Sequence, residues 1–460
     1  MSRSFERRHF LSLIAAGSAA VALGGLSCSR KRTGPPNIVL LFADDMGYGD
    51  LSCYGHPTIK TPFLDQMARE GVRMTSFYST AALCSPSRAA MLTGRYPLRC
   101  GMPHVLGPDS ENGLPESEIT MADALKKAGY RTMAIGKWHI GHMKKEFMPT
   151  SRGFDAYYGL LYSNDMMPPW VKTEKPLQLY RDLEPIEHPV EQETLTERYT
   201  EEAVKFIRSA KDGPFFLYLP YTMPHLPVRA SEKFSGTSRA GLYGDVIETI
   251  DWSAGKILQT LKELGLDKNT LVLFTSDNGP WCNMPPRMLH EGIEKWHAGT
   301  PGLLRGAKGT TYEGGHRVPG IARWPGVIPA KQETAEPANT MDLFTTILKV
   351  CGTDVPDDRV IDGLDILPLL KGQAKSPMKE FYYMAGYRLQ AVREGKWKYR
   401  LTNPAGDKNK RANKPLRELY DLDVDPSEKY NVVDRHPDLA AKLDQKLKAM
   451  AKQLNANIAE

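Results

Sequence analysis

A short apolar run, residues 37–43, constrains the fold of this 460-residue chain more than any other stretch. It is apolar at every position after Asn37 and contains β-branched residues, which is typical of a strand buried on both faces of a parallel sheet. Similar buried strands are expected at 215–219 and 271–274, and a long amphipathic helix is expected at 243–264. Repeated buried strands followed by helices predict an α/β fold.

Oxygen-bearing side chains follow two of these strands. Asp44 and Asp45 come directly after the first strand, and Asp277 and Asn278 follow the strand at 271–274. In open α/β sheets, ligands bind beyond the carboxyl ends of the strands. Two adjacent carboxylates in that position repel each other unless a cation lies between them, and hard oxygen ligands favour Ca²⁺ or Mg²⁺ over zinc. A solvated turn is the alternative interpretation of the aspartate pair alone.

Cys84 stands where a short helix is expected to begin. Ser85 is a suitable N-cap, Pro86 suits the first helical position, and Gly94 can end the helix in a left-handed conformation. The positive end of that helix suits an anionic substrate or a thiolate, and Arg88 in the first turn adds a fixed cation. The alternative is that Cys84 is a small buried hydrophobe before an ordinary helix.

Residues 84–95 also resemble the signature of the type I sulfatases: a cysteine, any residue, Pro-Ser-Arg, three residues, then Leu-Thr-Gly-Arg. The resemblance implies that Cys84 is converted to formylglycine, an aldehyde hydrated to a diol, by a formylglycine-generating enzyme. Further stretches resemble other motifs of the family, in the family's order. They are Asp44-Asp45, Gly136-Lys137-Trp138-His139, His225 with Pro227, Asp277-Asn278-Gly279 and 306–315. Together they look closest to the branch of arylsulfatase A and N-acetylgalactosamine-6-sulfatase.

The resemblance implies a role for each matching residue. One divalent cation, expected to be Ca²⁺, would be held by Asp44, Asp45, Cys84 after its conversion, Asp277 and Asn278. Catalysis would fall to Cys84, Arg88, His139 and His225. Sulfate would be bound by Lys137, Ser163, His225 and Lys308, with Ser163 placed in a Ser-Asn-Asp turn of a kind that is also common without a function.

Lys137 and His139 alternate after an expected strand at 131–136, so on a continuing strand both side chains would share one face. A surface lysine and a buried structural histidine are the alternative interpretation of this pair. The loop that follows Asp277 is a second point of interest, because an insertion at 281–306 is rich in Trp, His and Pro. We expect it to help form the leaving-group pocket through Arg287, His290, Trp296 and His297, although a surface loop would look the same.

The implied fold is the alkaline-phosphatase-like α/β sandwich, with a large mixed, mostly parallel sheet between helices and a small C-terminal antiparallel-sheet subdomain. The catalytic domain is expected over residues 33–374 and the C-terminal α+β subdomain over 375–460. The alternation of residues 381–401 is typical of antiparallel strands, and a charged helix is expected from His436 onward.

Residues 1–30 are expected to be an export signal. Arg7 and Arg8 with the residues after them resemble a twin-arginine signal, and the apolar run that follows is shorter than the ~20 residues that span a bilayer. This implies the Tat export machinery and a periplasmic or extracellular protein. Cys28 raises the alternative of a lipid anchor, although Gly25 replaces the aliphatic residue of that signal; a disordered basic terminus is the other alternative. No other stretch is apolar enough to predict a transmembrane helix.

The formal net charge is +6, and nearly all of it lies in the first 32 residues, so the composition gives no sign of a nucleic-acid partner. The six cysteines include no paired C-x-x-C motif, and their spacing assigns no disulfide. We expect a sulfatase acting on a sulfated glycan or small sulfate ester, such as a galactose or N-acetylgalactosamine 6-sulfate. The alternatives are a phosphomonoester or diester hydrolase of the same superfamily and a non-catalytic sulfoglycan-binding protein.

Overall fold

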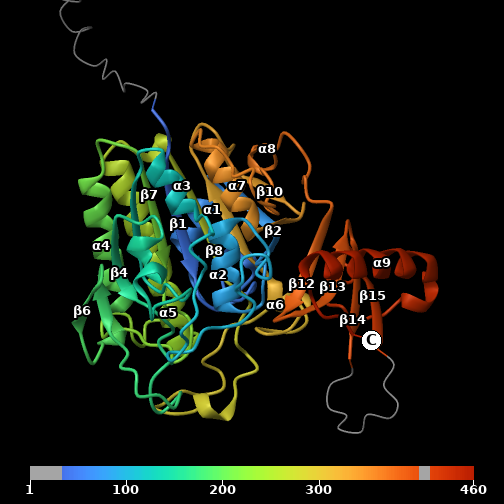
Figure 1. Cartoon of the computed structure of the whole chain (residues 1–460). Helices are drawn as coiled ribbons and strands as arrows, with labels where there is room; N and C mark the ends of the chain where they lie inside the picture. The colour runs from blue at the N-terminus through green and yellow to red at the C-terminus, as the bar shows by residue number, and fades with distance from the viewer. Residues whose placement is uncertain (1–33, 404–414, 460) are drawn as a thin grey trace, which may run out of the picture. The chain divides into compact units, whose positions relative to one another are not determined.

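A mixed eleven-stranded sheet lies between helices in the described residues of this computed structural model, which are 34–403 and 415–459 (Figure 1). Its strands are β1 (Asn37–Ala43), β2 (Val72–Tyr78), β3 (Arg131–Ile135), β4 (Ala156–Leu160), β5 (Leu179–Arg181), β6 (Glu184–Glu187), β7 (Phe215–Pro220), β8 (Thr270–Ser276), β9 (Arg317–Arg323), β10 (Gln332–Thr334) and β11 (Ala338–Asn339). They run in the order β10-β2-β9-β8-β1-β7-β3-β4-β5-β6, with β11 beside β2. The central strands β8, β1, β7, β3 and β4 are parallel, whereas β9 is antiparallel to β8 and β2.

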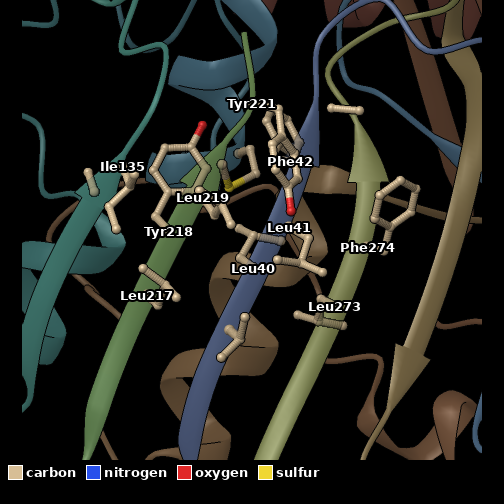
Figure 2. Packing of buried hydrophobic residues seen from close by; sticks show 14 of the residues in the cluster. Leu40, Leu41, Phe42, Ile135, Leu217, Tyr218, Leu219, Tyr221, Leu273 and Phe274 are labelled. Atoms are coloured by element: carbon tan, nitrogen blue, oxygen red, sulfur yellow. The ribbon is translucent and has the colours of Figure 1, made fainter. Parts of the chain in front are cut away.

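The core of the large sheet forms around β1, whose seven residues are all buried. It pairs in parallel with β7 and β8, so that Val39 lies opposite Leu217 and Val272. Figure 2 shows the side chains of these three strands packed together. Each fully buried Leu, Val or Phe stabilises the fold by about 1.5–3 kcal/mol. The predicted parallel strand at 37–43 is confirmed, and the carboxyl ends of β1, β7 and β8 meet at one edge.

Helices cover the large sheet and connect its strands. They are α1 (Pro62–Arg69), α2 (Cys84–Thr93), α3 (Met121–Lys127), α4 (Leu195–Ser209), α5 (Gly241–Glu263), α6 (Glu313–His316), α7 (Thr340–Val350), α8 (Leu367–Leu370) and α9 (Pro437–Leu454). Helix α5 contacts both α1 and α4, and α2, α3 and α7 form a second contacting group. Local sequence fixes some boundaries: Thr120 accepts a hydrogen bond from the Asp123 backbone N–H at 3.0 Å, which begins α3 with a capping box.

A second, four-stranded antiparallel sheet follows near the C-terminus. It consists of β12 (Glu380–Ala385), β13 (Arg388–Glu394), β14 (Trp397–Thr402) and β15 (Leu416–Asp421), and α9 packs against β13 and β14 (Figure 1). Tyr78 of the large sheet packs against Phe381 and Tyr383 of the small one. The chain from Pro35 onward forms one compact unit, and a subdomain boundary near residue 375 stays a prediction.

The start of α2 differs from the prediction. The helix begins at Cys84 itself, Leu83 is the N-cap, and Ser85 makes no cap hydrogen bond. The Ser85 hydroxyl instead accepts a hydrogen bond from the Leu106 backbone N–H at 3.1 Å. Pro86 is tolerated in the first turn because the N–H groups there have no partner within the helix. The predicted left-handed Gly94 is confirmed, with φ of 69°.

The strand before Lys137 is also shorter than predicted. It ends at Ile135, because Gly136 takes φ of 125° and a Cβ there would lie 1.9 Å from the Pro220 carbonyl oxygen. His139 itself has φ of 63°. The strand expected to continue through Lys137 and His139 is therefore absent, although both side chains are fully buried.

The predicted export signal, including Cys28, lies outside the described residues. Among the helices that are described, none is both long and apolar enough to cross a membrane. The cysteines within the described part of the chain, Cys53, Cys84, Cys100, Cys282 and Cys351, are all free.

Candidate active site

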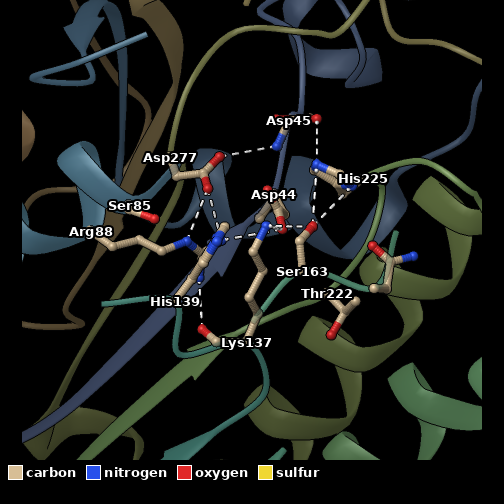
Figure 3. A network of polar contacts seen from close by, with 12 residues as sticks. Asp44, Asp45, Ser85, Arg88, Lys137, His139, Ser163, Thr222, His225 and Asp277 are labelled. Atoms are coloured by element: carbon tan, nitrogen blue, oxygen red, sulfur yellow. Dashed lines mark hydrogen bonds and ion pairs between the residues drawn. The ribbon is translucent and has the colours of Figure 1, made fainter. Parts of the chain in front are cut away.

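The predicted site residues gather at the carboxyl edge of the parallel strands, and Figure 3 labels most of them. Asp44 and Asp45 follow β1, His225 follows β7, and Asp277 and Asn278 follow β8. The remaining residues come from the ends of β3 and β4, from α2 and from the segment before α6, and they are Lys137, His139, Ser163, Cys84, Arg88 and Lys308. All eleven are at least nine-tenths buried. This edge is where ligands bind in α/β sheets.

Backbone hydrogen bonds between neighbouring strand ends hold this edge together. The Asp277 N–H donates to the Ala43 carbonyl oxygen at 3.1 Å, and the Lys137 N–H donates to the Pro220 carbonyl oxygen at 2.7 Å. Asp45 has φ of 65°, a left-handed conformation that aspartate tolerates better than most residues. The polar side chains are thus carried by backbone that the central strands fix.

Arg88 is buried at the centre of the site. Its Nε and Nη2 donate to the same oxygen, Oδ2 of Asp277, at 3.0 and 2.8 Å, and its Nη1 donates to the Lys137 carbonyl oxygen at 2.8 Å. Burial alone would raise the pKa of Asp277, but Arg88, Lys137 and Lys308 outweigh it and hold that pKa below its usual value. Asp277 is therefore a carboxylate paired with a guanidinium.

The two aspartates after β1 are each paired with a lysine. Asp44 Oδ2 accepts from Lys137 Nζ at 2.5 Å, and Asp45 Oδ1 lies 2.7 Å from Lys308 Nζ. Burial, with the nearby charge of Asp277, still raises the pKa of Asp44 to about 8, and burial raises that of Asp45. Burial outweighs the nearby lysines at both carboxyl groups, so a further cation between them would favour their ionised form.

Two oxygen atoms in the site fit a cation. Oδ1 of Asp44 and Oδ1 of Asn278 are buried and have no hydrogen-bond partner among the described residues. Unpaired buried oxygens cost free energy unless something satisfies them, and both are hard ligands. Ligand atoms of Asp44, Asp45 and His225 also lie within 4.8 Å of one another, a grouping that could hold a metal ion.

This grouping differs in part from the expected ligand set. His225 was expected to act on the substrate, and no sequence feature placed it with the metal ligands. Both carboxylate oxygens of Asp277 accept hydrogen bonds, one of them from the Asp45 N–H at 3.0 Å. The ligand roles of Asp277 and Cys84 stay predictions.

His225 has a defined hydrogen-bonding pattern. Its Nδ1 donates to the Leu226 carbonyl oxygen at 2.6 Å, which leaves Nε2 as the acceptor, 3.5 Å from Asp45 Oδ2. Ser163 Oγ lies 3.3 Å from the ring and accepts from Lys137 Nζ at 3.1 Å. Burial, followed by the charges of Lys308 and Lys137, lowers the pKa of His225 well below its usual value, so the ring is neutral.

His139 is the second neutral histidine. Its Nε2 donates to the Leu106 carbonyl oxygen at 2.8 Å, and its Nδ1 has no partner within the described residues. Burial, then the charges of Lys137 and Arg88, lower the pKa of His139 well below its usual value. His139 therefore presents an unprotonated Nδ1 that can accept a proton.

Cys84 lies in this environment as a thiol. Burial raises its pKa, and the nearby Lys137 and Lys308 only partly oppose that effect. Lys308 is an ammonium, because Asp45 outweighs the effect of burial and raises its pKa. The thiolate that the helix N-terminus suggested is therefore not favoured in this site.

The buried charges are balanced, with the cations Arg88, Lys137 and Lys308 facing the carboxyl groups Asp44, Asp45 and Asp277. Such a site can take up a divalent cation and an anion together without building a large net charge. An anion that binds without a divalent cation gains less electrostatic free energy, since the three cations of the site already have carboxyl partners.

Trp281 is a part of the site that sequence reasoning did not identify. Its ring centroid lies 5.4 Å from that of His225 and 4.6 Å from Lys308 Nζ. The sequence feature that could have identified Trp281 is its position next to Pro280, in the loop that follows Asp277. Of the residues expected to line a pocket, Arg287 reaches this tryptophan, whereas Trp296 is 70% exposed and its ring packs on His297.

Known proteins with similar sequences and structures bear on this site. Residues 36–353 match the family described as Sulfatase, and residues 307–454 match the one described as N-sulphoglucosamine sulphohydrolase, C-terminal. N-acetylgalactosamine-6-sulfatase of Mus musculus is 45% identical over 83% of this chain and 74% of its own. Arylsulfatase A of Homo sapiens is 38% identical over 94% of this chain and 90% of its own.

A solved structure described under the metabolism of multiple glycosaminoglycans by Bacteroides thetaiotaomicron superimposes with a TM-score of 0.80 at 30% identity. The match covers 91% of this chain and 100% of the other. The two layers of helices around a mostly parallel sheet, followed by the small antiparallel sheet, are the alkaline-phosphatase-like fold expected from the sequence.

Proposed function

We propose that this chain, which belongs to the sulfatase family and hydrolyses sulfate esters, acts on a sulfated carbohydrate of the galactose or N-acetylgalactosamine 6-sulfate type. Its likeness to N-acetylgalactosamine-6-sulfatase supports this substrate class. The observation that carries the proposal is the position of Cys84 at the start of α2, beside the buried cations Arg88, Lys137 and Lys308. Fixed cations in a buried pocket favour a sulfate group and the charge that develops on it.

We propose Ca²⁺ as the cation, held by Asp44, Asp45, Asp277, Asn278 and position 84. The unpartnered oxygens of Asp44 and Asn278 support an oxygen-ligated ion. When bound, Ca²⁺ would act as a Lewis acid that stabilises negative charge on oxygen. Lys137 and Lys308, which pair with Asp44 and Asp45 in this structure, would then direct their charge to the sulfate oxygens.

We propose that Cys84 is converted to formylglycine, which requires a formylglycine-generating enzyme as a partner. The hydrated aldehyde would supply an oxygen nucleophile for the sulfur atom, giving a covalent sulfo-enzyme, and a second hydroxyl whose deprotonation expels sulfate. A buried, protonated thiol is a weak nucleophile, which supports the modification over direct attack by sulfur. Arg88 and the positive end of α2 stabilise negative charge at position 84.

The two histidines and Lys308 supply the proton transfers of the proposed reaction. His139 Nδ1, which is unprotonated and unpartnered within the described residues, would take a proton from the group at position 84. Lys308, an ammonium, would give a proton to the oxygen of the leaving alcohol. His225 was expected to share this role, but its Nδ1 proton is held by the Leu226 carbonyl oxygen, so it would first have to be protonated at Nε2. Ser163 helps to orient Lys137 and His225, because its hydroxyl group contacts both side chains.

Sulfate release by Cys84→Ala tests the proposal, with protein made in a host that produces formylglycine. The substrates are galactose 6-sulfate and N-acetylgalactosamine 6-sulfate, and glycan binding is measured in parallel. We expect the variant to lose sulfate release while it keeps glycan binding. Unchanged turnover would show that the mechanism is wrong.

Two results with the unaltered protein would favour the alternatives. Binding of sulfated glycans without any sulfate release would indicate a non-catalytic binding protein. Faster hydrolysis of phosphate esters than of sulfate esters would indicate a phosphoester hydrolase of the same superfamily.

A further inference from the structure

A chain of contacts leads from the sulfate-binding residues to a polar pair that the proposed mechanism does not use. Trp281 packs against His225 and Lys308 on one side of this chain, and the Arg287 guanidinium carbon lies 5.5 Å from its ring centroid. Arg287 Nη1 is 3.5 Å from Asp165 Oδ2. Asp165 comes two residues after Ser163. One end of this series of contacts is therefore at His225 and Lys308, and the other end, Asp165, also lies close to an active-site residue.

Buried polar atoms around Arg287 are left without partners. Oδ1 of Asp165 and Nε1 of Trp170 are both buried and have no hydrogen-bond partner among the described residues. Arg287 touches both residues, because its Nη1 also donates to the Trp170 carbonyl oxygen at 2.9 Å. Asp165 Oδ1 is a free acceptor and Trp170 Nε1 a free donor, each on a side chain at least nine-tenths buried. Sugar hydroxyls can pair with either kind of atom, because a hydroxyl both donates and accepts.

The charge of this cluster favours a neutral group over a second anion. Asp165 brings a buried carboxylate, and its partner Arg287 compensates that charge. Arg229 lies 5.8 Å from the Trp170 ring but is paired with Glu193 and Glu291. A second sulfate or a carboxylate at this point would meet the Asp165 carboxylate without a free cation among these residues.

We propose that Asp165 and Arg287, with Trp170, form the subsite that reads the sugar hydroxyls of the leaving group, and that it selects a monosulfated neutral sugar over a disulfated sugar or a uronic acid. The inference rests on the proposed function, because it deepens the substrate class of the same site. Trp281 contacts Arg287 as well as His225 and Lys308, and so links this subsite to the sulfate-binding residues. Hydrogen-bonding subsites of this kind discriminate strongly, since a wrong group leaves buried polar atoms unpaired.

The test compares Asp165→Asn and Arg287→Ala with unaltered, formylglycine-bearing protein. Each protein is assayed for kcat and KM on N-acetylgalactosamine 6-sulfate, its 4,6-disulfate, and 4-nitrophenyl sulfate, which has no sugar hydroxyls. We expect the unaltered protein to prefer the monosulfate over the disulfate by at least tenfold. In both variants the ratio of kcat/KM for the monosulfated sugar to that for the aryl sulfate should fall at least tenfold. Arg287→Lys should restore part of the ratio.

Lys295→Ala is the matched control, because Lys295 belongs to the same loop, is exposed and has no role in the proposed site. Its substrate ratios should equal those of the unaltered protein. An unchanged ratio in Asp165→Asn and Arg287→Ala, or an equal loss on sugar and aryl sulfates, would overturn the inference. Hydrolysis of the aryl sulfate alone by the unaltered protein would also overturn it, whereas no hydrolysis of any sulfate ester would instead refute the proposed function.

Discussion

Lys398 of the small sheet donates a hydrogen bond to Glu313 at the start of α6, with 3.0 Å between Nζ and Oε1 and neither side chain exposed. The same ammonium lies 2.9 Å from Oε1 of Glu428, and the Glu428 side chain accepts from the Glu313 backbone N–H at 2.7 Å. Glu313 follows the segment that carries Lys308 by only a few residues. The C-terminal sheet therefore helps to fix one wall of the active site.

Lys398→Met is expected to destabilise the protein strongly. Burial would raise the pKa of Glu313, but Lys398, Arg393 and Arg317 outweigh it and hold that pKa at about 2. Removing Lys398 leaves this buried carboxylate beside Glu428 without its main partner, at a cost of about 3–5 kcal/mol in the free energy of unfolding. Urea denaturation followed by circular dichroism measures this loss.

Lys396→Met is the matched control for that experiment. Lys396 is two residues away and pairs with Asp421, but it lies on the surface, where an ion pair contributes little. Its unfolding midpoint should match that of the unaltered protein. Equal midpoints for the Lys398 and Lys396 variants would show that the buried contact does not stabilise the fold.

His316 is expected to make the stability of the protein sensitive to mild acid. It is fully buried between Phe381 and Tyr383, and burial lowers its pKa to about 4. The unfolded chain, with a pKa near 6.5, binds the proton more readily than the folded one. The stability that comes with a neutral, buried His316 is therefore fully present above pH 6.5 and is lost as the pH falls towards 4. The corresponding change in the free energy of unfolding is on the order of 3 kcal/mol.

His316→Gln should flatten this part of the pH dependence, measured as the free energy of unfolding at several pH values between 7 and 4.5. The matched control is His290→Gln, because His290 is exposed and should leave the dependence as it is. A pH dependence that the His316 variant fully retains would contradict this explanation.

Calcium is expected to stabilise the protein in the absence of any substrate. A ligand that binds only the folded state at 100 times its Kd adds about 2.7 kcal/mol to the free energy of unfolding. Thermal unfolding with chelator and with added Ca²⁺ measures the shift. Asn278→Ala should reduce it, because the variant removes a buried oxygen without a partner among the described residues, whereas exposed Asn283→Ala should keep it. Equal shifts in both variants would place the cation elsewhere.

The buried strands could be predicted from sequence because their signal is local. The run at 37–43 is continuous and apolar, and the structure makes it a strand with the same limits. The strand β9 gave no such signal, since Pro319 and Gly320 interrupt it. Its pairing with β2 is irregular between Met74 and Phe77, opposite this interruption, so tertiary packing rather than local propensity forms the strand.

The membership of the site could be predicted, but its internal contacts could not. The motif residues identified Asp44, Lys137 and Lys308 from their places along the chain. Nothing in the sequence states that Lys137 pairs with Asp44, which lies 93 positions earlier in the chain. The contact between Trp281 and His225 likewise depends on how two separate loops fold over one sheet edge.

The direct test of the central claim is the mass of the tryptic peptide Met74–Arg88, from protein made in a host that can produce formylglycine. We expect a mass in which the CH2–SH side chain of Cys84 has become a CHO group. Recovery of this peptide with Cys84 unmodified, from protein that nevertheless hydrolyses sulfate esters, would contradict a reaction that depends on formylglycine.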